Sequence, residues 1–120
     1  MIKSFINAWR GLKTIVRGRS FIWALVAGIG TIAVTWLFKE FTLSERLIVI
    51  VFVALVLSLE AMNTAVEKLA DIVKPAYSDR IKIVKDISAG AVLIAIIGAF
   101  ITWLIIVWDV FNRWYLLNSL

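Results

Sequence analysis

Four polar side chains share one face of a predicted helix and carry the groups that could do chemistry. Glu60, Asn63, Glu67 and Asp71 follow one another at intervals of three or four residues. At about 100° per residue, the last three fall within roughly 60° of Glu60. Their oxygen atoms suit a hard divalent cation such as Mg²⁺, which shares its ligands with phosphate groups. Carboxylates close to hydrocarbon are costly and indicate a functional site; the alternative is that they mark where a helix leaves the membrane and face water.

Glu60 and Lys85 suggest how phosphate chemistry could proceed. Glu60 directly follows the apolar run 47–59, so it is the candidate to accept a proton from a lipid hydroxyl. Lys85 precedes a later apolar run, and its ammonium group could neutralise a phosphate. The chain has no Cys and no His, so catalysis must use carboxylates, amides, hydroxyls, Lys and Arg. Gly28 and Gly30 lie inside an apolar run without a following Lys-Ser/Thr, which excludes a Gly-rich phosphate loop.

The composition predicts that these groups are positioned by membrane-spanning helices. Hydrophobic residues make up 62% of the 120 residues, and the mean hydropathy is +0.98. A chain this short cannot build a soluble core that large, so we expect an all-α integral membrane protein with residues 1–120 as a single membrane domain. The predicted spanning helices cover 21–38, 47–73 and 86–108. The apolar run 47–59 is too short to cross alone, so its helix must continue through Glu60.

The ends of the predicted helices follow from polar and special residues. Ser44 can cap the second spanning helix, and Lys74-Pro75 should end it. Residues 76–84, with Tyr77, form a predicted polar connection to the third span, although Ile81, Ile83 and Val84 could already begin the next helix. Small residues of the first span leave room for close packing against a neighbouring helix. These small residues are Ala24, Ala27, Gly28, Gly30 and Thr31.

Residues 1–19 form a predicted amphipathic surface helix that ends near Gly18. Its apolar face carries Trp9 as an aromatic anchor and its opposite face is basic, which suits the headgroup plane of a membrane. A soluble core helix and a secretory signal peptide are the alternatives. The apolar positions are Ile2, Phe5, Ile6, Trp9, Leu12 and Val16, and the polar ones are Lys3, Asn7, Arg10, Thr14 and Arg17.

The basic residues predict the orientation of the chain. Most of the 13 Lys and Arg residues either precede the first span or lie between the second and third spans. The positive-inside rule therefore places the N-terminus and the acidic stripe in the cytoplasm and the C-terminus outside. The net charge of +5 fits this topology and anionic headgroups better than nucleic acid. Only Lys39, Arg46 and Arg113 fall on the other side.

The stripe and the residues after Lys85 carry a family resemblance. Residues 60–67 fit the pattern E-x-x-N-[ST]-A-[IV]-E, and residues 85–92 fit K-D-x-x-[AS]-[AG]-A-V. Together they resemble the small bacterial diacylglycerol kinase/undecaprenol kinase family, and 9–12 fit the surface helix of that family. The resemblance implies a homotrimer of three-span subunits in the bacterial inner membrane, with active sites between protomers at the cytoplasmic face. Such enzymes transfer the γ-phosphate of MgATP to a lipid alcohol.

The resemblance also implies roles for individual residues. Glu60 matches the general base, Asn63 an amide near the reacting groups, and Glu67 a metal ligand. Lys85 and Asp86 match nucleotide-contacting positions. Thr64 and the run 89–93 resemble the undecaprenol kinase branch more than the diacylglycerol branch. The substrate- and nucleotide-binding set expected here is Asn63, Lys85, Asp86, Arg10, Arg17 and Arg19.

One position departs from the family pattern. Members carry a Glu just before the first span as a second metal ligand, where this chain has Gly18 or Arg19, neither of which can bind Mg²⁺. Arg17 or Arg19 could instead bind phosphate directly. The family's His between the second and third spans is also absent. The departure at Gly18 or Arg19 leads to one alternative, a catalytically silent lipid- or partner-binding module. A diacylglycerol kinase is a further alternative, and a stripe that packs a trimer through Asn63 and Thr64 could coexist with either function.

Overall fold

The computed structural model describes residues 1–73 and 78–119, and its regular elements there are four α-helices. Three of them are long and apolar enough to cross a membrane, as expected for an all-α membrane protein. The placement of the N-terminal helix on a membrane surface and the homotrimer stay predictions. The helices are α1 (Ile2–Ile15), α2 (Arg19–Leu37), α3 (Leu43–Val73) and α4 (Asp79–Asn118).

The last two helices extend beyond the predicted spans. The third helix begins at Leu43 rather than at residue 47, and the fourth runs far past 86–108 in both directions. With 40 residues at about 1.5 Å each, α4 is about 60 Å long, roughly twice the hydrocarbon thickness of a bilayer. Residues 79–84 are helical and not a connection, because charged residues without Gly or Pro do not stop a helix. The predicted helix end at Lys74-Pro75 and Tyr77 lie outside the described residues.

Gly18 separates the first two helices, as predicted. Its backbone is extended (φ −78°, ψ 128°), and it forms the N-cap of α2. The first helix ends at Ile15, earlier than the predicted limit at residue 19. At the start of α3 the predicted cap is wrong. Thr42, not Ser44, caps the helix: the Glu45 amide donates to Thr42 Oγ1 (3.3 Å), and the Thr42 amide donates to Glu45 Oε2 (2.7 Å). This reciprocal pair is a capping box.

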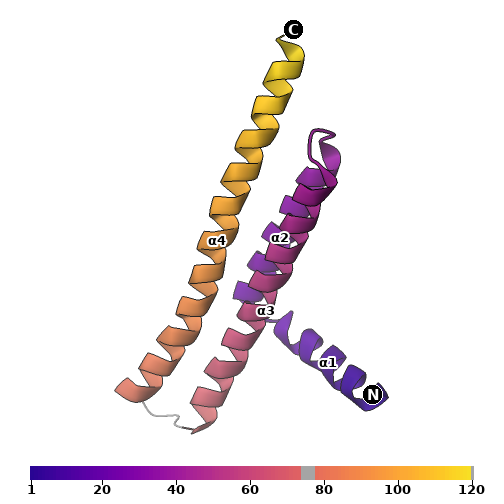
Figure 1. Ribbon diagram of the computed structural model, residues 1–120. Coiled ribbons are helices and arrows are strands. Elements are labelled where there is room, and N and C mark those ends of the chain that lie inside the picture. The colour runs from indigo at the N-terminus through magenta and orange to yellow at the C-terminus, as the bar shows by residue number, and fades with distance from the viewer. Residues whose placement is uncertain (74–77, 120) are drawn as a thin grey trace.

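The third helix packs against both α2 and α4, and α2 runs behind α3 in the view of Figure 1. The N-terminal helix leaves this bundle at the end where α3 stops and α4 starts (Figure 1). The turn between α2 and α3 and the C-terminus lie toward the opposite end (Figure 1). Near that opposite end, the buried side chains of Phe41, Val49 and Ile106 form a hydrophobic cluster. The bundle thus has one packed end and one end from which α1 projects.

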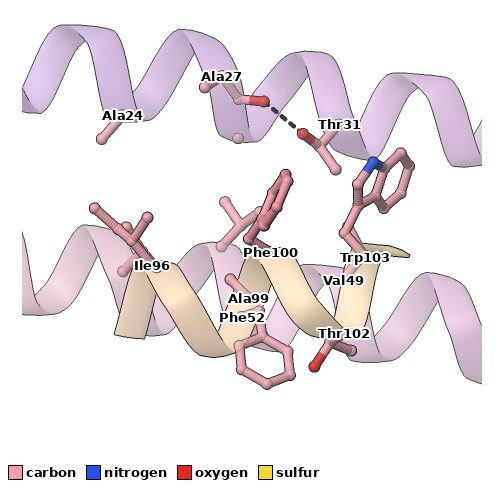
Figure 2. A pocket seen from close by; sticks show the side chains of 13 residues that line it. Ala24, Ala27, Thr31, Val49, Phe52, Ile96, Ala99, Phe100, Thr102 and Trp103 are labelled. Atoms are coloured by element: carbon pink, nitrogen blue, oxygen red, sulfur yellow. Dashed lines mark hydrogen bonds between the residues drawn. The ribbon is translucent and has the colours of Figure 1, made fainter. Parts of the chain in front are cut away.

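A groove of about 320 Å³ runs between the three spanning helices (Figure 2). Small residues of α2, among them Ala24 and Ala27, line it, so much of their face borders open space rather than a helix. Gly28 does make the predicted close contact: an added Cβ would lie 2.6 Å from Cγ1 of Val53 on α3. Gly30 has no such neighbour within 4 Å among the described residues. The predicted close packing thus applies to one of the two glycines.

Candidate active site

Glu60 is a buried carboxylate at the junction of α2 and α3. Only 8% of the residue is exposed, although a carboxylate is among the side chains least often buried. Ser20, in the first turn of α2, donates a hydrogen bond from its hydroxyl to Oε2 of Glu60 over 3.0 Å. The two helices run in opposite directions, so the start of α2 lies beside the part of α3 where the apolar run ends (Figure 1). This packing holds an ionisable group against the apolar part of the bundle.

Asn63 and Glu67 lie on the same face of α3 as Glu60, one and two turns further along the helix. The Asn63 amide nitrogen donates to Glu67 Oε1 over 3.2 Å, within the same helix. The other side-chain atom of Asn63, Oδ1, is buried and has no hydrogen-bond partner among the described residues. Glu67 itself is exposed. An exposed carboxylate is a hard oxygen donor, so Glu67 fits a Mg²⁺ ion that takes its remaining ligands from phosphates and water, whereas the buried Asn63 oxygen lies away from it.

Lys85 and Asp86 point to different neighbours. Lys85 Nζ lies 2.5 Å from Asp71 Oδ1, which joins the start of α4 to the outer end of the stripe. Asp86 pairs with Lys82 on its own helix over 2.7 Å. The structure therefore brings Lys85 to the stripe, and it does not bring Asp86 there. A phosphate bound by Lys85 would have to replace or join the Asp71 carboxylate, which is 66% exposed and free to move.

The carboxylates of the stripe are spread along the helix and do not converge. From Glu60 to Asp71 the rise is about 16 Å. Within residues 1–73 and 78–119, no group of three or more acidic side chains lies close enough together to hold a metal ion. The helical stripe predicted from the sequence thus exists as a face, with Ser20, Asn63 and Lys85 each bonding a different carboxylate.

The three predicted arginines lie on or just after α1. Arg10, Arg17 and Arg19 are all exposed. Of these, Arg17 borders a second groove, which runs between α1, α2 and α3 and passes Ala61, the neighbour of Glu60. The lining of this groove is mostly apolar, and its charged members are Lys13 and Arg17. Its apolar side chains include Trp9, Leu12, Phe21, Leu57 and Met62.

Ser20 is a site residue that the sequence did not point to, and Thr64 makes its hydrogen bond within its own helix. Ser20 could have been flagged, because a polar residue at the start of one span lies at the same membrane depth as Glu60 on the antiparallel span. Thr64 donates its hydroxyl to the Glu60 carbonyl oxygen over 3.0 Å, within α3. Asn63 also bonds within α3. The bonds of Asn63 and Thr64 across the helices of a trimer stay a prediction, because they would join different subunits.

Comparison with known proteins identifies the family. Residues 6–107 match the model of the family described as prokaryotic diacylglycerol kinase. The chain is 33% identical over 114 residues to the diacylglycerol kinase of Escherichia coli, covering 93% of this chain and 92% of that one. It is 32% identical over 105 residues to the undecaprenol kinase of Bacillus subtilis, covering 86% and 85%. A diacylglycerol kinase of Synechocystis is 33% identical over 103 residues, covering 84% of this chain and 58% of the relative.

These relatives confirm the predicted resemblance and the prediction of an enzyme. The matches to the E. coli and B. subtilis proteins span nearly the whole of each chain, and both relatives are lipid kinases. The matched region of the family model contains the stripe of α3, Lys85 of α4 and most of α1. The chain has three helices that can cross a membrane and a buried carboxylate among them, which agrees with these matches. The chain belongs to the prokaryotic diacylglycerol kinase family.

Proposed function

We propose that this membrane lipid kinase transfers the γ-phosphate of ATP to the hydroxyl of undecaprenol in preference to diacylglycerol, with Glu60 as general base. The observation that carries the proposal is the burial of Glu60 next to Ala61, a residue that lines an apolar groove. A carboxylate in that place can accept a proton from a hydroxyl at the head of a lipid whose chain lies in the groove. Kinase chemistry in the family supports ATP as the phosphate donor.

The proposed step needs one proton acceptor and a neutralised phosphate chain. Glu60 accepts the proton of the lipid hydroxyl, and the hydroxyl oxygen forms a bond to the γ-phosphorus. The bond from that phosphorus to the β–γ bridging oxygen breaks, and ADP leaves with the bonding electron pair. Glu67 would hold Mg²⁺, which offsets negative charge on the phosphates when it is bound, and the Asn63 amide would lie near the reacting groups. Lys85 would bind a phosphate in exchange for Asp71.

The remaining predicted residues are proposed to bind the nucleotide or the lipid phosphate. Arg17 lines the groove that passes Ala61, the neighbour of Glu60, and Arg10 and Arg19 are exposed on nearby segments. Asp86 would have to leave Lys82 to contact the nucleotide, since the two form an exposed pair. Guanidinium groups bind phosphate oxygens through paired hydrogen bonds, which supports a role for Arg17 in particular.

We propose that the Glu60 end of the bundle faces the cytoplasm across a bacterial inner membrane. The N-terminal helix lies at the same end of the bundle as the start of α4 (Figure 1). Both regions are rich in Lys and Arg, and the positive-inside rule places such regions in the cytoplasm. In this orientation the site meets cytosolic ATP and membrane lipid at once, and the C-terminus lies outside.

We propose a homotrimer whose subunits complete one another's sites. Two features of the single chain support it. Its carboxylates do not converge within the described residues, so a neighbouring subunit would have to supply further polar groups around the phosphates. Large apolar side chains are exposed along all three spanning helices, and these can contact lipid or a second subunit.

The choice of acceptor rests on residues around the stripe. Thr64 and the run 89–93 favour undecaprenol, while the relatives include both kinds of kinase at nearly equal identity. Purified protein in lipid vesicles, with labelled ATP and Mg²⁺, should be offered undecaprenol, diacylglycerol and other lipid alcohols in parallel. We expect phosphorylated undecaprenol to form fastest. Faster transfer to diacylglycerol would contradict the preference and leave the kinase function standing.

A catalytically silent module is the alternative, and one observation favours it. Neither Gly18 nor Arg19 can supply the carboxylate expected before the first span. If the chain is silent, no lipid in the panel is phosphorylated, although the protein still binds lipid vesicles. Any robust product that depends on Mg²⁺ and ATP, and disappears in Glu60→Gln, eliminates this alternative.

A further inference from the structure

We infer that Ser20 is a positioning residue for the lipid kinase reaction, holding the Glu60 carboxylate so that one oxygen is free to take the proton. The inference rests on the proposed role of Glu60 as general base. Its geometric basis is the 3.0 Å hydrogen bond from the Ser20 hydroxyl to Oε2 of Glu60. Nothing in the family pattern of the sequence points to Ser20.

This hydrogen bond differs in kind from the other hydroxyl contacts of the chain. In the described residues, every other hydroxyl that donates a hydrogen bond donates to a backbone carbonyl three or four residues earlier. Such bonds satisfy a polar side chain within its own helix or at its end and link nothing else. Ser20 instead donates to a carboxylate 40 residues away on another helix. As the second residue of α2, Ser20 has no carbonyl of its own helix three or four residues earlier, and its hydroxyl instead bonds to the carboxylate of α3.

The contact fixes the side chain that has to react. Glu60 carries three rotatable side-chain bonds, and the only side chain that donates to its carboxylate among the described residues is Ser20. With Oε2 accepting this bond, Oε1 remains to accept the proton of the lipid hydroxyl. The bond also gives the carboxylate a partner in a place where only 8% of the residue is exposed. Ser20 keeps its own proton throughout.

The position of Ser20 in the chain connects the groove to the proposed base. Ser20 is the second residue of α2, two positions after the Gly18 N-cap that separates α2 from α1. The groove that passes Ala61, the neighbour of Glu60, is lined from both of these helices, by Trp9 and Phe21 among others. The same short segment therefore shapes the groove for the lipid chain and orients the base that acts on the lipid hydroxyl.

The test compares variants of Ser20 in the vesicle assay. We expect Ser20→Ala to lower kcat about 10-fold, which is about 1.4 kcal/mol of transition-state stabilisation, with KM for ATP and lipid changed less than twofold. Ser20→Thr restores the hydroxyl and should recover most of kcat. Ser20→Cys keeps the side-chain size with a weak donor and should lie between the two, and it serves if the Ala variant does not fold. Thr31→Val removes a hydroxyl of α2 that bonds only to the Ala27 carbonyl, and it should leave kcat unchanged.

Infrared difference spectra give a readout that needs no turnover. The spectrum of wild type minus Glu60→Gln isolates the carboxylate bands of Glu60, and these bands should shift in Ser20→Ala but not in Thr31→Val. A wild-type kcat in Ser20→Ala, or a Ser20→Thr variant as slow as Ser20→Ala, overturns the inference while the kinase function stands. A wild type that phosphorylates no lipid alcohol overturns the proposed function and the positioning role with it.

Discussion

The two ends of the bundle use polar side chains in opposite ways. We call them the Arg113 end (residues 38–46 and 103–113) and the Glu60 end (Ser20, Glu60, Asn63, Glu67 and Lys85). At the Arg113 end, Nη2 of Arg113 lies 2.8 and 2.9 Å from the two carboxylate oxygens of Glu45 and 3.0 Å from the Glu40 carbonyl oxygen. Nη1 of the same guanidinium binds Asp109. One side chain thus joins α4 to α3 and to the turn before it.

Packing at the Arg113 end reinforces these bonds. The rings of Phe41 and Trp103 stack with their centroids 6.0 Å apart, and the guanidinium of Arg46 lies 4.8 Å from the ring centre of Trp36. The side chain of Glu45 is only 13% exposed, and it also caps α3. At the Glu60 end, in contrast, Glu60, Glu67 and Lys85 each have a single side-chain partner among the described residues. Groups with one exchangeable partner can bind substrate, whereas groups with several partners hold the fold.

The largest expected effect is the loss of kcat in a variant of the proposed base at the Glu60 end. Glu60→Gln removes the base but keeps the shape of the side chain, so kcat should fall by about 10²–10⁴-fold with the fold intact. The matched variant is Glu45→Gln, the same exchange at the Arg113 end. It should lower thermal stability and leave kcat per folded molecule near wild type. Vesicle assays and thermal unfolding in detergent measure both quantities, and full turnover by Glu60→Gln would refute its role as base.

Glu67→Ala sharpens the comparison through the metal. We expect the Mg²⁺ concentration for half-maximal activity to rise about 10-fold or more, because the variant loses the one exposed carboxylate proposed as ligand. Glu40→Ala is the control, since only the backbone carbonyl of Glu40 takes part in the network at the other end. Titration of Mg²⁺ at fixed ATP is the measurement. An unchanged Mg²⁺ requirement in Glu67→Ala would remove Glu67 from the metal site.

Arg113→Ala tests the opposite end by stability. The variant leaves the mostly buried Glu45 carboxylate without its cation, so the free energy of unfolding should fall by about 1–3 kcal/mol. Activity of the molecules that remain folded should change little. Lys82→Ala is the matched control, because Lys82 and Asp86 form an exposed pair with side chains 58% and 62% exposed. Such a pair contributes about 0.2–1 kcal/mol. Equal losses in the two variants would contradict the difference between the ends.

The sequence predicts the helices and the acidic face because both depend on local periodicity. Apolar runs of spanning length mark α2, α3 and α4, and spacing alone aligns Glu60, Asn63, Glu67 and Asp71. Limits of helices are less predictable. The charged residues from Asp79 onward extend α4, since nothing in them stops a helix that has already begun.

The spacing of residues within one helix does not predict which residues contact each other between helices. The bond from Ser20 to Glu60 depends on how α2 is rotated against α3, and no pattern in either helix sets that rotation. The same holds for Lys85, which faces Asp71, and for Asp86, which faces away. The cap at Thr42 was predictable in principle, because Thr42 and Glu45 have the spacing of a capping box.

The smallest expected effect is on the close contact between Gly28 and Val53, which lies between the two ends. Gly28 lies in the middle of α2, and an added Cβ would come within 2.6 Å of Val53, a β-branched side chain that cannot easily turn away. Gly28→Ala should therefore force α2 and α3 apart and lower the free energy of unfolding by about 1–2 kcal/mol. Gly30→Ala meets no atom within 4 Å among the described residues, so it should be neutral or slightly stabilising as a better helix former. Thermal unfolding of both variants measures the difference. If Gly28→Ala also shifts the Ser20–Glu60 spacing, it should lower kcat where Gly30→Ala does not, and equal behaviour of the two variants would show that this close approach does not control either end.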